Sequence, residues 1–152
     1  MKRRRIEKPT TRNTAASELL WLVGEAFRQT RQPIDQLVRD YGVTATQFGI
    51  LKRLADNPGL SAADVARHNF ISPQAAHVAL TTLERKGLVT RDARTDNRRI
   101  SGAELTKRGE RVLETCRDAV QPIGEHFFVT LTTNERRVLV ELLRRCIAES
   151  GD

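Results

Sequence analysis

The residue types best able to do chemistry in this chain are concentrated in one arginine-rich segment. The stretch RDARTDNRRI, residues 91–100, holds four arginines and two aspartates. Guanidinium groups bind phosphates and base edges, and an aspartate two residues from an arginine can hold that arginine in one orientation. Unpaired arginines on a loop would repel one another and bind any anion. We therefore interpret the segment as an oriented probe for a polyanion.

A second set of candidate residues lies just upstream, on a helix predicted over residues 73–86. Ser72 is predicted as its N-cap and Pro73 as its first helical residue. Helical spacing turns Ala76, Leu80 and Leu83 inward. The opposite face carries five side chains, none of them acidic: Gln74, His77, Val78, Thr81 and Arg85. Such a face can enter the major groove of DNA and meet base edges there.

Two more short helices and a hairpin would position these groups. A helix is predicted from the capping-box spacing of Thr44 and Gln47 to an Asn-Pro-Gly stop. A shorter helix begins at Ser61, with Asp64 three residues on, and an Asn-Phe turn follows it. The runs LVT and ISGAEL, on either side of the arginine-rich segment, predict the two strands of a hairpin. A glycine weakens the second strand. Together these elements predict a winged helix-turn-helix, whose arginine-tipped hairpin can reach a minor groove.

A long helix is predicted before this unit, over residues 14–39. Its apolar side chains recur at spacings of three and four, beginning with Leu19, Leu22 and Val23. Pro33 is expected to kink or interrupt it. Four aromatic side chains at helical spacing are assigned to the core rather than to a pocket wall: Trp21, Phe27, Tyr41 and Phe48.

Two helices are predicted after the hairpin, over residues 106–120 and 134–149. A kink or a break is expected between them at Gln121-Pro122, and Thr132 with a glutamate three residues on predicts the cap of the last helix. The apolar stripes of these helices contain the two cysteines of the chain, Cys116 and Cys146. We expect these thiols to be packing residues rather than redox sensors.

Composition limits the class of protein. The chain has 152 residues, 39% of them hydrophobic, which is enough for one core, and its net charge of +7 favours a polyanionic partner. No run of residues is long and apolar enough to be a membrane span or a secretory signal, so we expect a cytoplasmic protein. Residues 1–13 are polar and basic and are expected to form a disordered arm.

Catalytic and metal-binding patterns are not found in the sequence. The cysteines form no CxxC pair, the three histidines have no zinc-ligand spacing, and neither a phosphate loop nor a nucleophile-base pair is recognisable. We therefore expect no catalytic residue, no metal and no cofactor. The classes compared are a DNA-binding regulator, an enzyme, and a winged-helix module that binds a partner protein without specific DNA binding.

The segment LERKGLVTRDARTDNRRISGAELTKRG resembles the wing region of the MarR family, the multiple-antibiotic-resistance regulators. The family pattern is Leu-Glu-x-x-Gly-Leu-Val, an Asp-x-Arg at the wing tip and then Leu-Thr-x-x-Gly, and all three pieces occur here in order. The late run LTTNERRVLVELL resembles the start of the family's final helix. SPQAAH occurs at the start of the recognition helix in some members. The resemblance extends from about Leu19 to Ile147.

The resemblance implies roles for particular residues. Asp96 would orient Arg98, and Arg98 would enter the minor groove. The full set of implied or candidate DNA-binding residues is Ser72, Gln74, His77, Val78, Thr81, Arg94, Asp96, Arg98 and Arg99. Ser72 and Arg99 are the candidates for phosphate contacts. Many members have threonine at the position of Ala75 and arginine at that of Val78, so the base preference of this chain would differ.

The resemblance also implies a homodimer and a small-molecule effector. The terminal helices of family members pack against those of a second subunit, which would cover apolar stripes that a small winged unit cannot cover. Phenolic or aromatic acids bind family members where the dimer helices meet the winged unit, and Trp21, Arg28 and His68 are the candidates here. His126, beside two phenylalanines, is predicted either to line a pocket or to be buried. The sequence does not decide between an effector-binding protein and one that binds no small molecule.

Together these features predict a mainly α protein with one MarR-like unit over residues 14–152. Residues 43–105 would form the winged helix-turn-helix with its small β-hairpin wing, and residues 14–42 and 106–152 the dimerisation helices. The predicted function is that of a sequence-specific transcriptional regulator, a ligand-responsive repressor. It would act as a homodimer on an inverted repeat in double-stranded DNA, in the nucleoid of a bacterial or archaeal cell, and not at a membrane.

Overall fold

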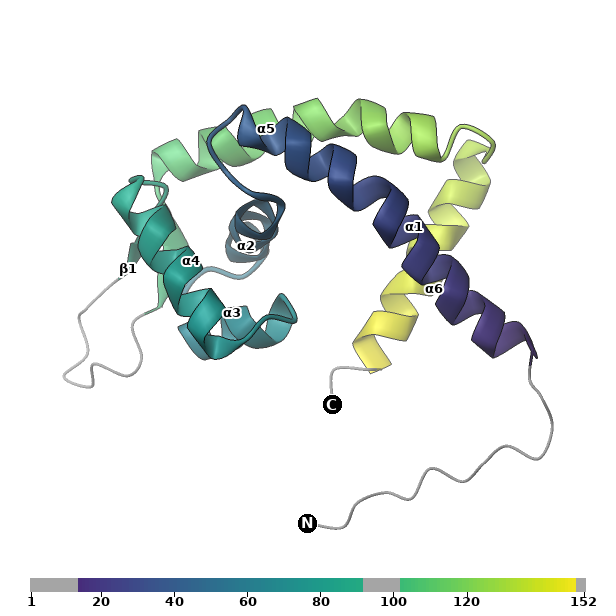
Figure 1. The fold of residues 1–152 in the computed structure, drawn as a ribbon, viewed down its shortest axis with the longest axis horizontal. Helices are drawn as coiled ribbons and strands as arrows, with labels where there is room; N and C mark the ends of the chain where they lie inside the picture. Colours follow the sequence, from purple (N-terminus) through teal and green to yellow (C-terminus); the bar gives the residue numbers. More distant parts are fainter. Residues whose placement is uncertain (1–13, 92–101, 150–152) are drawn as a thin grey trace, which may run out of the picture.

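Six helices and one short hairpin make up the described part of the computed structural model, residues 14–91 and 102–149 (Figure 1). In chain order they are α1 (Thr14–Arg39), α2 (Ala45–Asp56), α3 (Ala62–His68), α4 (Pro73–Arg85), β1 (Val89–Arg91), β2 (Ala103–Leu105), α5 (Lys107–Phe127) and α6 (Thr133–Glu149). This confirms the mainly helical architecture. Within the described ranges, no helix is both long and apolar enough to cross a membrane.

The short helices begin where local hydrogen bonds satisfy their first N–H groups. At the start of α2, the Thr44 hydroxyl accepts the N–H of Gln47 at 3.2 Å, and the Gln47 side chain accepts the N–H of Thr44 at 3.2 Å. Ser61 and Asp64 make the same reciprocal pair at the start of α3. Both capping boxes are confirmed, so the boundaries of these helices follow from residues three positions apart.

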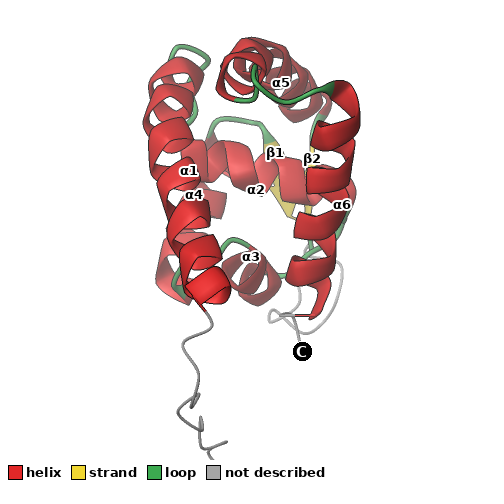
Figure 2. Cartoon of the chain, turned by 90° about the vertical axis from the view of Figure 1, so that its right-hand side faces the viewer, coloured by secondary structure: helices red, strands yellow, loops and turns green. Residues whose placement is uncertain are grey.

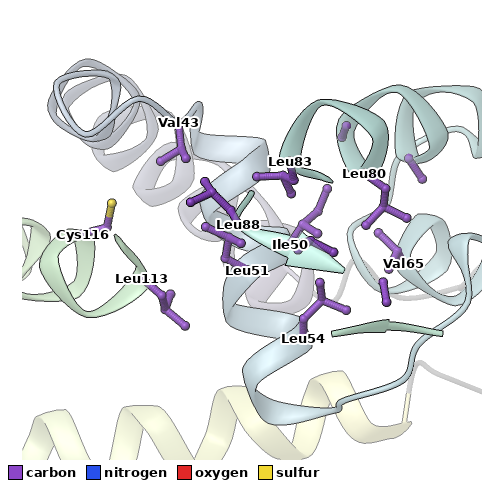
Figure 3. Close-up of a cluster of buried hydrophobic side chains, with 14 of the residues drawn as sticks. Val43, Ile50, Leu51, Leu54, Val65, Leu80, Leu83, Leu88, Leu113 and Cys116 are labelled. Carbon is purple, nitrogen blue, oxygen red and sulfur yellow. The ribbon is translucent and has the colours of Figure 1, made fainter. Parts of the chain in front are cut away.

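The core lies between α2, α4 and the first half of α5 (Figure 3). Ile50, Leu51 and Leu54 of α2 are buried against side chains from α4, and Leu113 of α5 is also buried. Val65 contributes from α3. Burial of each such aliphatic side chain stabilises the folded state by about 1.5–3 kcal/mol. These contacts join α2, α3 and α4 into one unit with the hairpin.

The hairpin is antiparallel, and Val89 is paired with Leu105. A third segment joins it, because Ala103 donates its N–H to Leu60 and accepts the N–H of Gly59. At Gly102 a Cβ atom would stand 2.7 Å from the carbonyl oxygen of Gly59. The glycine predicted to weaken the second strand lies just before β2, where it permits this close approach.

Helix α1 runs without interruption through Pro33, so of the kink or interruption expected at this residue, the interruption is wrong. A proline removes one helical hydrogen bond and crowds the preceding turn. Here its ring lies on an exposed part of the helix, while Ile34 and Val38 pack against the core. This packing holds the last turns of α1 in place and offsets the cost of the proline.

Helix α5 also continues through a proline, so of the kink or break expected at Gln121-Pro122, the break is wrong. It extends to Phe127, seven residues beyond the predicted end at Val120. Val120 and Ile123, on either side of the proline, are half-buried, and α1 packs along α5 (Figure 1). The tertiary contact therefore outweighs the local preference of Gln-Pro to end a helix.

The assignment of the aromatic side chains to the core is wrong for most of them in the single chain. Trp21 is 67% exposed, Phe27 58% and Tyr41 39%, and only Phe48 packs against the core. For Trp21 and Phe27 the reason is that α1 extends beyond the winged unit. Figure 2 shows α1 and α6 on opposite sides of the view with α5 above them, and α6 packs extensively against no other described element. His126 is exposed too. Of its two predicted roles, lining a pocket or being buried, the buried one is therefore wrong.

Candidate nucleic-acid interface

The predicted recognition helix is α4, and its orientation is set by its buried side. The Ser72 hydroxyl accepts the N–H of Ala75 at 3.1 Å, Pro73 begins the helix, and Gly87 ends it with φ of +67°. Ala76 and Leu80 are fully buried. The predicted contact residues Ser72, Gln74, His77, Val78 and Thr81 are all exposed. The structure therefore brings these five side chains together on one helix, with none of them used for packing.

The hairpin is tied to one edge of this face by an ion pair. The guanidinium of Arg91, at the end of β1, donates from Nε to Glu84 Oε2 at 2.9 Å and pairs with it again through Nη2. Its Nη2 also donates to the Thr81 hydroxyl at 3.4 Å. Glu84 is the acidic group nearest the exposed face in the helix sequence, and the pair compensates its charge. The sequence placed Arg91 in the predicted probe segment 91–100, but in the structure its guanidinium is paired with Glu84, a residue to which the sequence gave no role.

The remaining predicted DNA-binding residues come after Arg91 in the chain. Arg94, Asp96, Arg98 and Arg99 lie outside the described residues. Their roles stay predictions from the sequence. The described strands β1 and β2, which flank these residues in the chain, nevertheless pair as a hairpin beside α4.

A narrow groove of about 400 Å³ borders the other edge of α4. It lies between α4 and the first turn of α2, and its walls include Thr44, Thr46, Ser72, Gln74 and Val78. The exposed face of α4 is therefore flanked by the hairpin on one side and by the start of α2 on the other. Sequence reasoning missed this neighbour, because α2 and α4 are brought together only by the shared core.

A wide groove of about 850 Å³ lies on the other side of the same two threonines, along α1. Its walls include Phe27, Arg28, Arg31, Asp35, Arg39 and Thr46. The walls include three arginines and one aspartate, so an anion would be favoured there.

The three effector-site candidates are only partly brought together. The Arg28 guanidinium lies 5.4 Å from the centre of the Trp21 ring, a cation–π arrangement, and Arg28 also pairs with Glu25. Arg28 lines the wide groove. His68 is exposed at the end of α3 and is not among the residues lining either groove.

The two cysteines differ in their surroundings. Cys116 is fully buried in the core, and burial raises the pKa of its thiol. A thiol with a raised pKa forms little thiolate, so the packing interpretation holds for Cys116. Cys146 is exposed on α6 in the single chain, so it is not a packing residue within that chain.

A short helix pair, a turn, an exposed polar helix face and a hairpin on a common core define a winged helix-turn-helix protein. Comparison with known proteins identifies the family. The model of the MarR family matches residues 41–99. The HTH-type transcriptional repressor Rv2887 of Mycobacterium tuberculosis is 31% identical over 127 residues, 84% of this chain and 89% of the relative. This chain belongs to the MarR family of transcriptional regulators.

The structural comparisons agree with this assignment. The crystal structure of Rv2887 in complex with DNA matches with a TM-score of 0.69 and 27% identity, over 84% of this chain and 96% of that one. The structure of the same relative with salicylic acid matches with a TM-score of 0.70 and 29% identity, over 84% and 95% of the two chains.

Proposed function

We propose that this chain is a homodimeric, sequence-specific repressor that binds an inverted repeat in double-stranded DNA and is released by a small aromatic anion. The exposed face of α4 carries the proposal, because it presents hydrogen-bonding groups beside a hairpin and none of its five predicted contact residues is acidic. The relative Rv2887 is named a repressor and has been crystallised with DNA, which supports the same activity here. Such a regulator acts on the cytoplasmic DNA of a bacterial or archaeal cell.

A dimer is proposed from the apolar surface that the single chain leaves exposed. On α1 this surface includes Leu19, Leu22 and Val23, each more than half exposed. On α6 it includes Leu142 and Ile147, at 49% and 65%. Contiguous apolar surface of this kind marks a protein interface. A second copy of the chain would cover both helices. The two α4 helices of the resulting dimer would then meet DNA with two-fold symmetry.

The wide groove is the proposed effector site. Its arginines suit a carboxylate and Phe27 offers an apolar wall, while the relative Rv2887 has been crystallised with salicylic acid. Arg28→Ala is expected to weaken salicylate binding at least about tenfold, as loss of a charged hydrogen bond does. Arg111→Ala, an exposed arginine of α5 outside the groove walls, is the matched control. Calorimetric titration with salicylate measures both, and equal affinities would contradict this site.

Selection of bound duplexes from random DNA tests the DNA-binding function. The recovered site is expected to be an inverted repeat with half-sites about 10 base pairs apart or a multiple of that. Gln74→Ala should reduce discrimination at one position of each half-site by about 1–3 kcal/mol. Gln121→Ala makes the same change on the exposed surface of α5 and should leave discrimination unchanged. A footprint over one asymmetric half-site would contradict the proposal.

Salt dependence separates this function from that of a protein-interaction module. A dimer that contacts about 6–10 phosphates loses about 10³- to 10⁵-fold in affinity between 50 and 200 mM salt. A module that binds a protein partner would select no duplex and would depend weakly on salt. Recovery of no enriched site, together with weak salt dependence, would favour the module.

A further inference from the structure

Asp35 joins the long helix α1 to the first residue of α2. Its Oδ1 accepts the N–H of Ala45 at 2.8 Å, and its Oδ2 accepts a hydrogen bond from Arg39 Nε at 2.9 Å. Asp35 and Ala45 are ten residues apart, so this bond connects two helices instead of capping one locally. The first N–H group of α2 is thus satisfied by a carboxylate from the dimerisation helix.

The Asp35 carboxylate is held in its charged form. The hydrogen bond from Ala45 lowers the pKa of Asp35 below its ordinary value, and the hydrogen bond from Arg39 lowers it further. Both contacts therefore persist at neutral pH and weaken only as pH falls through that lowered pKa.

A second contact joins the same two helices. Arg31 Nη2 donates to the Thr46 hydroxyl at 3.2 Å, and its guanidinium lies 5.4 Å from the centre of the Phe27 ring. Thr46 also lines the narrow groove beside Gln74 and Val78. The start of α2 is therefore in contact with α1 on one side and faces the recognition helix on the other.

The apolar packing of α1 on the core brings the two parts together, but it does not fix their relative orientation as directly as a hydrogen bond does. Val38 is buried there and Ile34 is half-buried. Apolar contact is non-directional, whereas a hydrogen bond specifies both distance and angle. Because α2 and α4 share one rigid core, the bond from Asp35 constrains α4 as well as α2.

We propose that Asp35 is a positioning residue that sets the angle between α1 and the winged unit, and with it the separation of the two α4 helices in the dimer. The inference rests on the proposed dimeric DNA-binding function. Each base pair inserted between half-sites shifts one of them by about 3.4 Å and rotates it by about 34°. A fixed angle therefore makes the dimer selective for one spacing, and a loose angle makes it tolerant.

The experiment measures affinity for three duplexes: the selected site and versions with one base pair added to or removed from its spacer. The affinity of the wild-type dimer is expected to fall at least about tenfold at either altered spacing, which is the loss that a mismatched base pair causes. The Asp35→Ala variant should bind the selected site several-fold more weakly than the wild type does. Its affinity should fall only about twofold further at the altered spacings. Base preference within each half-site should not change, since the face of α4 is intact.

Two further variants control for stability and chemistry. Asp64→Ala makes the same change at a carboxylate that bonds Ser61 Oγ at 2.6 Å within the capping box of α3. It should lower the melting temperature yet keep the wild-type spacing selectivity. Asp35→Asn keeps an oxygen acceptor for Ala45 and should retain most of the selectivity, and a full loss would overturn the role of that hydrogen bond.

The remaining outcomes separate this inference from the function on which it rests. A folded Asp35→Ala dimer with wild-type spacing selectivity overturns the inference, as does an equal loss of selectivity in Asp64→Ala. A wild-type protein indifferent to spacing contradicts the dimeric operator-binding function itself, and the inference fails with it. If Asp35→Ala does not fold, Asp35→Ser takes its place in the same comparison. Kept spacing selectivity then overturns the inference, and lost selectivity supports it.

Discussion

At the residue scale, Phe70 has a backbone conformation that its side chain does not favour. It lies in the turn between α3 and α4 with φ of +52°, and its side chain is 92% exposed. Asparagine tolerates this left-handed region better than a large aromatic residue does. Phe70→Asn is therefore expected to raise the free energy of unfolding by about 1 kcal/mol. Phe70→Ala keeps the backbone strain, so its free energy of unfolding should rise little. Urea denaturation measures both, and an equal loss of stability in the two variants would show that the ring makes stabilising contacts.

The wing-tip prediction also belongs to single residues and depends on the sequence alone. Arg98→Ala should weaken specific binding and flatten the salt dependence by about one counterion. For Asp96→Ala, two models give opposite signs. If Asp96 only tempers positive charge, its removal tightens binding to the specific site. If Asp96 orients Arg98, its removal weakens specific binding and leaves non-specific affinity equal or higher. One titration at fixed salt distinguishes them, and tighter specific binding would refute the orienting role.

At the element scale, two glycines of α5 have opposite roles. A Cβ atom at Gly109 would stand 2.0 Å from the carbonyl oxygen of Leu88, whereas one at Gly124 would meet nothing within 4 Å. Gly109→Ala should therefore destabilise the protein by about 1–3 kcal/mol, because backbone cannot move aside cheaply. Gly124→Ala should stabilise it by about 0.5–1 kcal/mol, since alanine favours the helix. Thermal denaturation of the pair tests this, and a stable Gly109→Ala variant would mean that α5 can shift away from Leu88.

This contact gives a physical reason for the glycine that closes the Leu-Thr-x-x-Gly pattern. Thr106 caps α5 by accepting the N–H of Gly109 at 3.0 Å, and its hydroxyl donates to the carbonyl of Gly87 at 2.7 Å. The start of α5 is thereby held directly against the end of α4 and the beginning of β1. The threonine and the glycine act together, one through hydrogen bonds and the other through the absence of a side chain.

At the scale of the whole molecule, the apolar surface of α6 predicts an obligate partner helix. Leu142→Glu places a charge on that surface and should shift the protein to monomers, because a buried unpaired charge is costly. Arg144 is two residues further along and so lies about 200° around the helix, and Arg144→Glu introduces the same residue there with little expected effect. Removal of residues from Thr132 onward should abolish dimerisation and tight DNA binding together. Sedimentation analysis measures these effects, and a stable, fully active monomer would contradict them.

Features built from residues three or four positions apart could be predicted from the sequence. The capping boxes at Thr44 and Ser61, the cap of α4 at Ser72 and the two faces of that helix all agree with the structure. Each depends on a hydrogen bond or a periodicity that is complete within one turn of helix. For the same reason Gln74, His77, Val78 and Thr81 could be named from the sequence as members of one exposed face, before their neighbours were known.

Contacts between distant residues were decided only by the tertiary structure. The pairing of Arg91 with Glu84, the bond from Asp35 to Ala45 and the approach of Gly109 to Leu88 each join separate elements. The two prolines, Pro33 and Pro122, do not interrupt their helices, because packing between α1, α5 and the core outweighs a local preference. An apolar stripe indicates which side of a helix avoids water, but it does not say what covers that side. That is why the sequence correctly marked α1 and α6 as apolar, while only the fold showed that Trp21 and Phe27, which had been assigned to the core, are exposed in the single chain.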